Sequence, residues 1–218
     1  KAGVKRFIFI SSIKVNGEKS QVDMPFCFDD PRQPKDPYGV SKAKAEEGLI
    51  KIASETGLEV TIIRPPLVYG PNVKANFASL LKLAEKNIPL PIGSIQNKRS
   101  FVSIDNLVSL IIACINHPNA ANQVFLVSDD QDVSTPKLFS LMVEAFGKKP
   151  RLFKVSPKFL RFIASLIGKR KLIDRLCEDL SVDIWHTKKL LNWCPVVSIT
   201  DGIKICATNS FGDKKGDL

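Results

Sequence analysis

A tyrosine and a lysine four residues apart stand at the start of an expected helix. In the segment DPYGVSK, Asp36 is a typical N-cap residue and Pro37 a typical first-turn residue. Residues four apart share a helix face, so Lys42 should stand beside the phenol of Tyr38. A free phenol keeps its proton at neutral pH, but a nearby ammonium and the positive helix end stabilise the phenolate. The pair could serve as a general base, although this spacing also arises easily by chance in a Lys-rich chain.

Two serines follow directly on a segment that is expected to form a buried strand. The strand is Val4 to Ile10 (VKRFIFI), and Ser11 and Ser12 come next. Open α/β sheets bind ligands at the carboxyl ends of their strands, where a serine hydroxyl can bond to a substrate oxygen. Serine also follows strands simply as a turn former, so this signal is weak by itself.

Strands and helices alternate along the rest of the chain. Further strands are expected at 58–64, 99–104, 123–127 and 152–155. Helices are expected at 37–56, 76–86, 105–116 (with Asp105 as its N-cap), 135–146, 159–167, 172–176, 184–191 and 200–210. This alternation predicts a mostly parallel sheet with crossover helices.

The composition is that of an ordinary globular protein with a basic surplus. Of 218 residues, 44% are hydrophobic, and 32 Lys or Arg against 22 Asp or Glu give a net charge of +10. The surplus suits an acidic partner, but the basic clusters are short and lack interleaved aromatic residues, which argues against nucleic acid. Five cysteines without a CxxC pair and two histidines predict reduced thiols, a cytoplasmic location and no metal site. No apolar run is long enough for stable membrane insertion.

One segment, 157–176 (PKFLRFIASLIGKRKLIDRL), is both basic and amphipathic. It could bind a membrane surface, or it could be a packed helical pair of a substrate lobe. We favour the packed pair, because amphipathic helices are most often core elements.

Five segments in order resemble the extended short-chain dehydrogenases, specifically the NAD-dependent sugar-nucleotide epimerase/dehydratase family. They are FIFISSIKVNGE, DPYGVSK, IIRPPLVYGP, RSFVSIDNLV and LLNWCP. SSIKVNGE and RPPLVYGP are most similar to bacterial enzymes of UDP-N-acetyl sugars, the 4-epimerases and quinovosamine-type 4-reductases.

The resemblance implies a partial Rossmann-like, doubly wound parallel sheet with a small mixed α/β substrate lobe. Residues 1–70 would be the C-terminal half of the dinucleotide-binding domain, with the catalytic residues. Residues 71–210 would be the lobe, interleaved with the last strand and helix of the sheet at about 99–130, and 211–218 a flexible tail. The first strands, with the family's glycine-rich phosphate motif, are expected ahead of Lys1, so the chain is expected to be truncated at its N-terminus.

The resemblance also implies residue roles. Ser12 would bond to the sugar hydroxyl that is oxidised, Tyr38 would exchange its proton, and Lys42 would support Tyr38 and hold the nicotinamide ribose. The cofactor, NAD with NADP not excluded, would also contact Ile10, Ser11, Pro65 and Pro66. The substrate would also contact Lys14, Leu67, Asn76, Phe77, Leu90, Ile92, Arg99 and Arg175. From the residues alone, Leu90 and Ile92 could instead be core residues, Asn76 a helix cap, and Arg99 a surface charge.

The expected activity is 4-epimerisation of a nucleotide sugar, UDP-glucose or UDP-N-acetylglucosamine, by transient oxidation at C4. Two alternatives stay open: a single reduction of a UDP-4-keto-6-deoxy sugar by NAD(P)H, and a nucleotide-sugar-binding fragment without catalysis. The full-length protein is expected to form a homodimer, and this chain alone is expected to be inactive.

Overall fold

The computed structural model describes the backbone at residues 3–73 and 75–211, and the side chains there except at 75, 76, 210 and 211. The predicted tail at 211–218 thus falls almost wholly outside the described residues. The chain divides into two compact units. Unit 1 comprises residues 1–68, 100–131 and 180–197, and unit 2 comprises 69–99, 132–179 and 198–218.

Unit 1 is built on a three-stranded parallel sheet in the order β1-β2-β5. The strands are β1 (Arg6–Ile10), β2 (Glu59–Arg64) and β5 (Val124–Leu126). The register of β1 on β2 runs from Arg6↔Glu59 to Ile10↔Ile63. β3 (Leu67–Tyr69) pairs separately with β4 (Phe101–Ser103). The parallel sheet confirms the predicted fold class and places the carboxyl ends of β1 and β2 at one edge.

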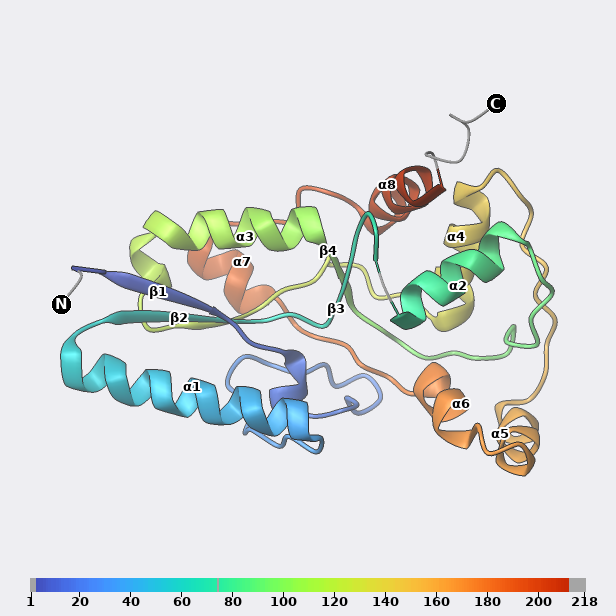
Figure 1. Cartoon of the computed structure of the whole chain (residues 1–218), viewed down its shortest axis with the longest axis horizontal. Helices are drawn as coiled ribbons and strands as arrows, with labels where there is room; N and C mark the ends of the chain where they lie inside the picture. The colour runs from blue at the N-terminus through green and yellow to red at the C-terminus, as the bar shows by residue number, and fades with distance from the viewer. Residues whose placement is uncertain (1–2, 74, 212–218) are drawn as a thin grey trace. The chain divides into compact units, whose positions relative to one another are not determined.

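Helices cover both faces of this sheet (Figure 1). α1 (Pro37–Thr56) lies on one face, and α3 (Ile104–Asn116) and α7 (Trp185–Leu191) lie on the other. Two short 3₁₀ turns, η1 (Ile13–Val15) and η2 (Pro118–Ala120), complete the unit. Because the sheet is covered on both sides, β2 and β5 bury side chains on both faces, and Ile62, Ile63, Phe125 and Leu126 are almost wholly buried.

Local signals explain where the first helix begins and ends. The Asp36 carboxylate accepts a hydrogen bond from the Gly39 amide at 2.6 Å, and Gly57 ends α1 in the left-handed region with φ +72°. The expected N-cap of α3 is wrong. Ser103, the last residue of β4, caps that helix by accepting from the Asn106 amide at 3.1 Å, and Asp105 lies in its first turn. The strand passes into the helix without a loop, so the cap falls two residues earlier.

Unit 2 is mostly helical. Its helices are α2 (Ala75–Glu85), α4 (Thr135–Ala145), α5 (Pro157–Leu166), α6 (Arg170–Cys177) and α8 (Ile199–Phe211). α2 and α8 each pack against α4, and α5 packs against α6. The strand expected at 152–155 is wrong: Leu152 makes only an isolated bridge with Leu90. In the part of the chain that the structure describes, every helix lacks either the length or the apolar character that crossing a bilayer requires.

Candidate active site

The turn that follows β1 is held against the end of β2. The Ser11 amide donates to the Ile63 carbonyl at 2.7 Å, and the Ile13 amide donates to the Pro65 carbonyl at 2.9 Å. Ser12, half-buried between them, caps η1 by accepting from the Lys14 amide at 3.3 Å. The backbone therefore sets Ser12 beside the buried Pro65, at the carboxyl end of the sheet.

The start of α1 lies directly on this turn. A Cβ built on Gly39 would come within 2.8 Å of the Lys14 carbonyl oxygen, so the two backbones approach as closely as glycine allows. Lys14 also forms an ion pair with Asp36, the N-cap of the helix. The structure thus brings η1 and the first turn of α1 together. Ser12 directly precedes η1 and Tyr38 lies in that first turn, so these two residues are brought together as well.

Lys42 links this helix to the end of β1. Its ammonium donates to the Ile10 carbonyl at 2.8 Å and lies 4.7 Å from the centre of the Phe9 ring. It lies 5.9 Å from the centre of the Tyr38 ring, whose residue is 51% exposed. A fixed ammonium, an accessible phenol and a serine hydroxyl thus occur at the strand ends where open α/β sheets bind ligands. Such groups can bind a hydroxylated substrate and exchange a proton with it.

We expect Gly39→Ala to destabilise unit 1 by about 1–3 kcal/mol, because the added methyl meets a backbone oxygen that cannot rotate away. Gly48→Ala is the matched control on the same helix, since a Cβ there meets nothing within 4 Å. That change should preserve stability or raise it by up to about 1 kcal/mol. Urea unfolding measures the free energy of unfolding of both variants. If both substitutions lowered it equally, the close approach of residue 39 to the Lys14 carbonyl would be unimportant.

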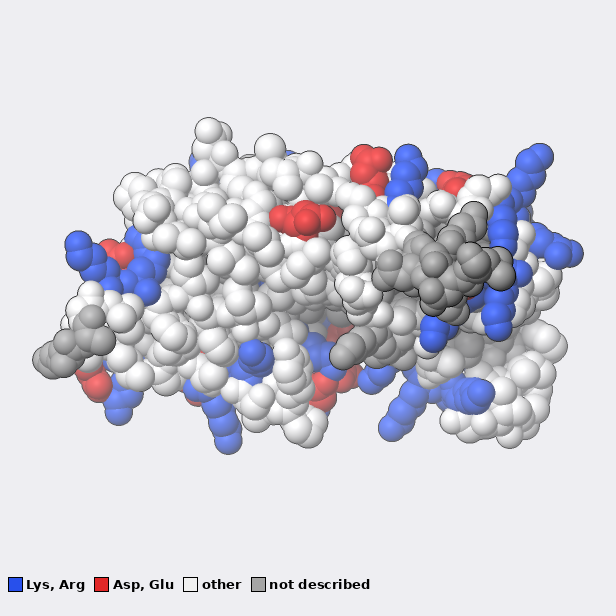
Figure 2. All heavy atoms as spheres, turned by 45° about the horizontal axis from the view of Figure 1, so that its top comes forward, with Lys and Arg blue, Asp and Glu red and all other residues white. Residues whose placement is uncertain are grey.

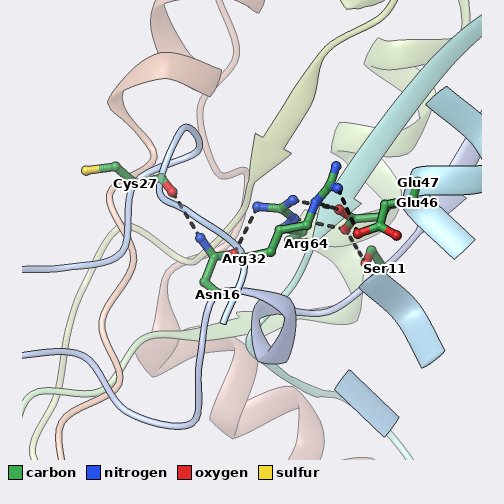
Figure 3. Close-up of polar contacts among 7 residues, drawn as sticks. All are labelled: Ser11, Asn16, Cys27, Arg32, Glu46, Glu47 and Arg64. Atoms are coloured by element: carbon green, nitrogen blue, oxygen red, sulfur yellow. Dashed lines mark hydrogen bonds and ion pairs between the residues drawn. The ribbon is translucent and has the colours of Figure 1, made fainter. Parts of the chain in front are cut away.

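A buried ionic cluster that was not predicted from the sequence lies next to these residues (Figure 3). Glu46, one turn after Lys42 on α1, is fully buried. Its carboxylate accepts from the Arg64 Nη2 at 2.6 Å and Nε at 2.9 Å, and from the Ser11 hydroxyl at 2.6 Å. Arg32 approaches the same carboxylate at 3.2 Å. Ser11 was predicted to contact the cofactor, and its side chain is turned to Glu46.

The cluster continues through Asn16 to the following loop. The Arg64 Nη1 donates to the Asn16 side-chain oxygen at 3.0 Å, and the Asn16 side-chain nitrogen donates to the Cys27 carbonyl at 3.2 Å. We call Ser11, Asn16, Arg32, Glu46 and Arg64 the Glu46 cluster. It joins the turn that carries Ser12, the helix that carries Tyr38 and Lys42, and the strand end before Pro65. Two sequence signals were present: an arginine that ends a strand expected to be buried, and a glutamate four residues after Lys42.

In unit 2 the predicted substrate ligands Arg99 and Arg175 lie together. The Arg99 Nη1 donates to the Arg175 carbonyl at 2.7 Å and to the Glu178 carbonyl at 3.4 Å, at the carboxyl end of α6. Burial lowers the pKa of Arg99, and the charges of Glu178 and Asp179 oppose that shift. The guanidinium therefore holds the end of α6 as well as being a candidate anion ligand.

The remaining predicted ligands lie in varied surroundings. Phe77 is buried with its ring stacked on Tyr69, 5.2 Å between centres, and Ile92 is buried. The side chain of Asn76 lies outside the described residues. Pro66 is buried, Leu90 half-buried and Leu67 partly exposed. Their contacts with a substrate or cofactor stay predictions.

A parallel sheet with helices on both faces, and Ser, Tyr and Lys at its strand ends, places the chain in the Rossmann-like class. The model of the NAD dependent epimerase/dehydratase family matches residues 1–128. The UDP-glucose 4-epimerase of Vibrio cholerae is 53% identical over 204 residues, which are 93% of this chain and 62% of that protein. The chain belongs to the NAD dependent epimerase/dehydratase family.

Two further similarities are more distant. The dTDP-4-dehydro-6-deoxyglucose reductase of Escherichia coli is 27% identical over 207 residues, which are 92% of this chain and 60% of that protein. A crystal structure of the Thermotoga maritima UDP-glucose 4-epimerase with UDP-glucose superposes with a TM-score of 0.73 at 25% identity. That match covers 99% of this chain and 65% of the Thermotoga chain. The chain therefore spans less than two thirds of the length of these relatives.

Proposed function

We propose that the protein carrying this chain is an NAD-dependent nucleotide-sugar 4-epimerase, with UDP-glucose or UDP-N-acetylglucosamine as substrate. The observation that carries the proposal is the anchoring of Lys42 to the Ile10 carbonyl, which puts its ammonium beside Tyr38 at the carboxyl end of β1. Family membership and the similarity to the Vibrio UDP-glucose 4-epimerase support it. A cytoplasmic location and a homodimer belong to the same proposal.

The residues at the end of β1 fit the nicotinamide–ribose end of a dinucleotide. An ammonium and a phenol hydroxyl are suitable partners for ribose hydroxyls, and Lys42 and Tyr38 carry these groups. When bound, NAD would take a hydride from the sugar C4 and return it. Tyr38 would take the proton of the C4 hydroxyl and give it back, while the Ser12 hydroxyl would hold that oxygen. Lys42 would stabilise the phenolate form of the tyrosine during the exchange.

The direct test is a product assay on the full-length protein with UDP-glucose and a trace of NAD. We expect UDP-galactose to form, detected by anion-exchange chromatography, without net change in NADH absorbance. The same assay with UDP-N-acetylglucosamine decides the preferred sugar. If UDP binds but neither sugar is converted, the epimerase proposal is wrong and a nucleotide-sugar-binding role takes its place.

A second candidate is a single 4-keto reduction, which the similarity to the E. coli 4-dehydro sugar reductase favours. The same tyrosine would then give its proton to the substrate once, and NAD(P)H would be consumed. Stoichiometric loss of NADH absorbance with a UDP-4-keto-6-deoxy sugar would establish this activity in place of the epimerase.

A further inference from the structure

The apolar stripe of α5 faces outward. Phe159, Phe162, Ile163 and Leu166 recur at intervals of three and four residues, which places them on one side of the helix. Phe159, Phe162 and Leu166 are 57%, 59% and 69% exposed. The opposite side carries Ala164, the one buried residue of this helix. The pattern is the reverse of an ordinary surface helix, which turns its apolar stripe inward.

Basic side chains border this stripe. Lys158 lies on α5, and Lys169, Arg170 and Lys171 follow at its C-terminal end, all four exposed. Segment 157–177 holds six Lys or Arg and one acidic residue, Asp174. That carboxylate is paired with Arg161 at 3.0 Å and lies 3.7 Å from Arg170. We call Lys158, Lys169, Arg170 and Lys171 the basic rim.

Figure 2 shows uncharged surface next to blue side chains at its lower right, in the part of the view where Figure 1 places α5 and α6. The two helices pack on each other, as predicted from the sequence. That packing uses the side of α5 opposite the stripe and leaves the two phenylalanines in solvent. Packing among the described residues therefore does not account for the apolar stripe of α5.

We propose that the α5 stripe and its basic rim bind the surface of an anionic lipid bilayer. A helix with exposed aromatic and aliphatic residues on one side and lysines along its border lies in the plane of a membrane interface. Its lysines are attracted by anionic headgroups, and its apolar side chains enter the boundary with the acyl chains. α5 is too short to span a bilayer, so the association is peripheral.

The charge of the basic rim favours a bilayer over a second copy of the chain as the binding partner of the stripe. In a two-fold dimer the same patch occurs on both sides of the interface, so two basic rims would face each other across the stripe. Like charges brought together in this way oppose association. An anionic bilayer complements both the stripe and the rim. The proposal does not depend on the catalytic activity proposed above.

The test is cosedimentation of the full-length protein with lipid vesicles. One vesicle is phosphatidylcholine alone, and the other is phosphatidylcholine with an equal amount of phosphatidylglycerol. We expect binding to the anionic vesicle that weakens as salt rises, and little binding to the neutral one. Phe159→Ser/Phe162→Ser should weaken anionic binding at least about tenfold. Lys169→Glu/Lys171→Glu should weaken it about 30-fold or more at low salt.

The control is Val22→Ser/Val196→Ser, which removes two apolar side chains of unit 1 that are more exposed than the two phenylalanines, and should leave vesicle binding unchanged. If the phenylalanine variant does not fold, the lysine variant decides, because its side chains are fully on the surface. Absence of binding to the anionic vesicle overturns the proposal. So does equal binding to both vesicles, or a concentration-dependent dimer that the phenylalanine variant abolishes.

Discussion

Tyr38→Phe is expected to lower the turnover of the full-length protein on UDP-glucose by about 10³-fold, the scale of a lost general acid–base group. Phenylalanine keeps the ring beside Lys42 and removes only the hydroxyl that we propose exchanges the proton. The side chain is 51% exposed, so the free energy of unfolding should change little. Steady-state turnover by product chromatography and urea unfolding, on the same preparation, measure the two quantities.

The chain offers a matched control in its other tyrosine. Tyr69 is almost wholly buried, and its hydroxyl lies 3.5 Å from the Ile199 carbonyl. Tyr69→Phe should therefore lower stability by about 1 kcal/mol and leave turnover within about twofold. Tyr38→Phe is thus expected to lose turnover and keep its stability, whereas Tyr69→Phe is expected to lose stability and keep its turnover. If Tyr38→Phe retained wild-type turnover, proton exchange would have to be assigned to another group.

The elements that the sequence predicted well are those with local signals. α1 begins after Asp36 and ends before Gly57, as expected, because both caps act on neighbouring residues. β3 was missed, since three residues after Pro65 and Pro66 carry no clear period and become a strand only by pairing with β4. The strand expected at 152–155 has the right composition but only a single bridge to Leu90.

In the candidate site, too, the features with local sequence signals were predicted and those that depend on distant residues were not. Tyr38 and Lys42 are one turn apart on a helix, so their relation could be predicted from spacing alone. The burial of Glu46 depends on Arg64, Ser11 and Arg32, which come from other parts of the chain. For α5, periodicity predicted a stripe correctly, but it carries no information on which way the stripe faces. The first case depends on partners that are distant in sequence, and the second on which side of α5 packs against the neighbouring α6.

Glu46→Gln is expected to lower the free energy of unfolding by about 3–5 kcal/mol, because it leaves the charge of the buried Arg64 without its counter-ion. Glu47→Gln is the control one residue away. Its side chain is 62% exposed and lies 3.5 Å from Arg32, so its loss should matter by less than about 0.5 kcal/mol. Urea unfolding of the two variants separates the buried charge from a general effect of lost acidity on α1.

Removal of both charges tests whether Glu46 and Arg64 act as a pair. Arg64→Met alone leaves the buried carboxylate with Arg32 and Ser11 and should also be strongly destabilising. In the double variant neither charge is stranded, so the combined loss should fall short of the sum of the single losses by about 1–3 kcal/mol. Additive losses would mean that the two residues stabilise α1 and β2 independently. A coupled loss would show that the helix of Tyr38 and Lys42 is held to the end of β2 by one shared interaction.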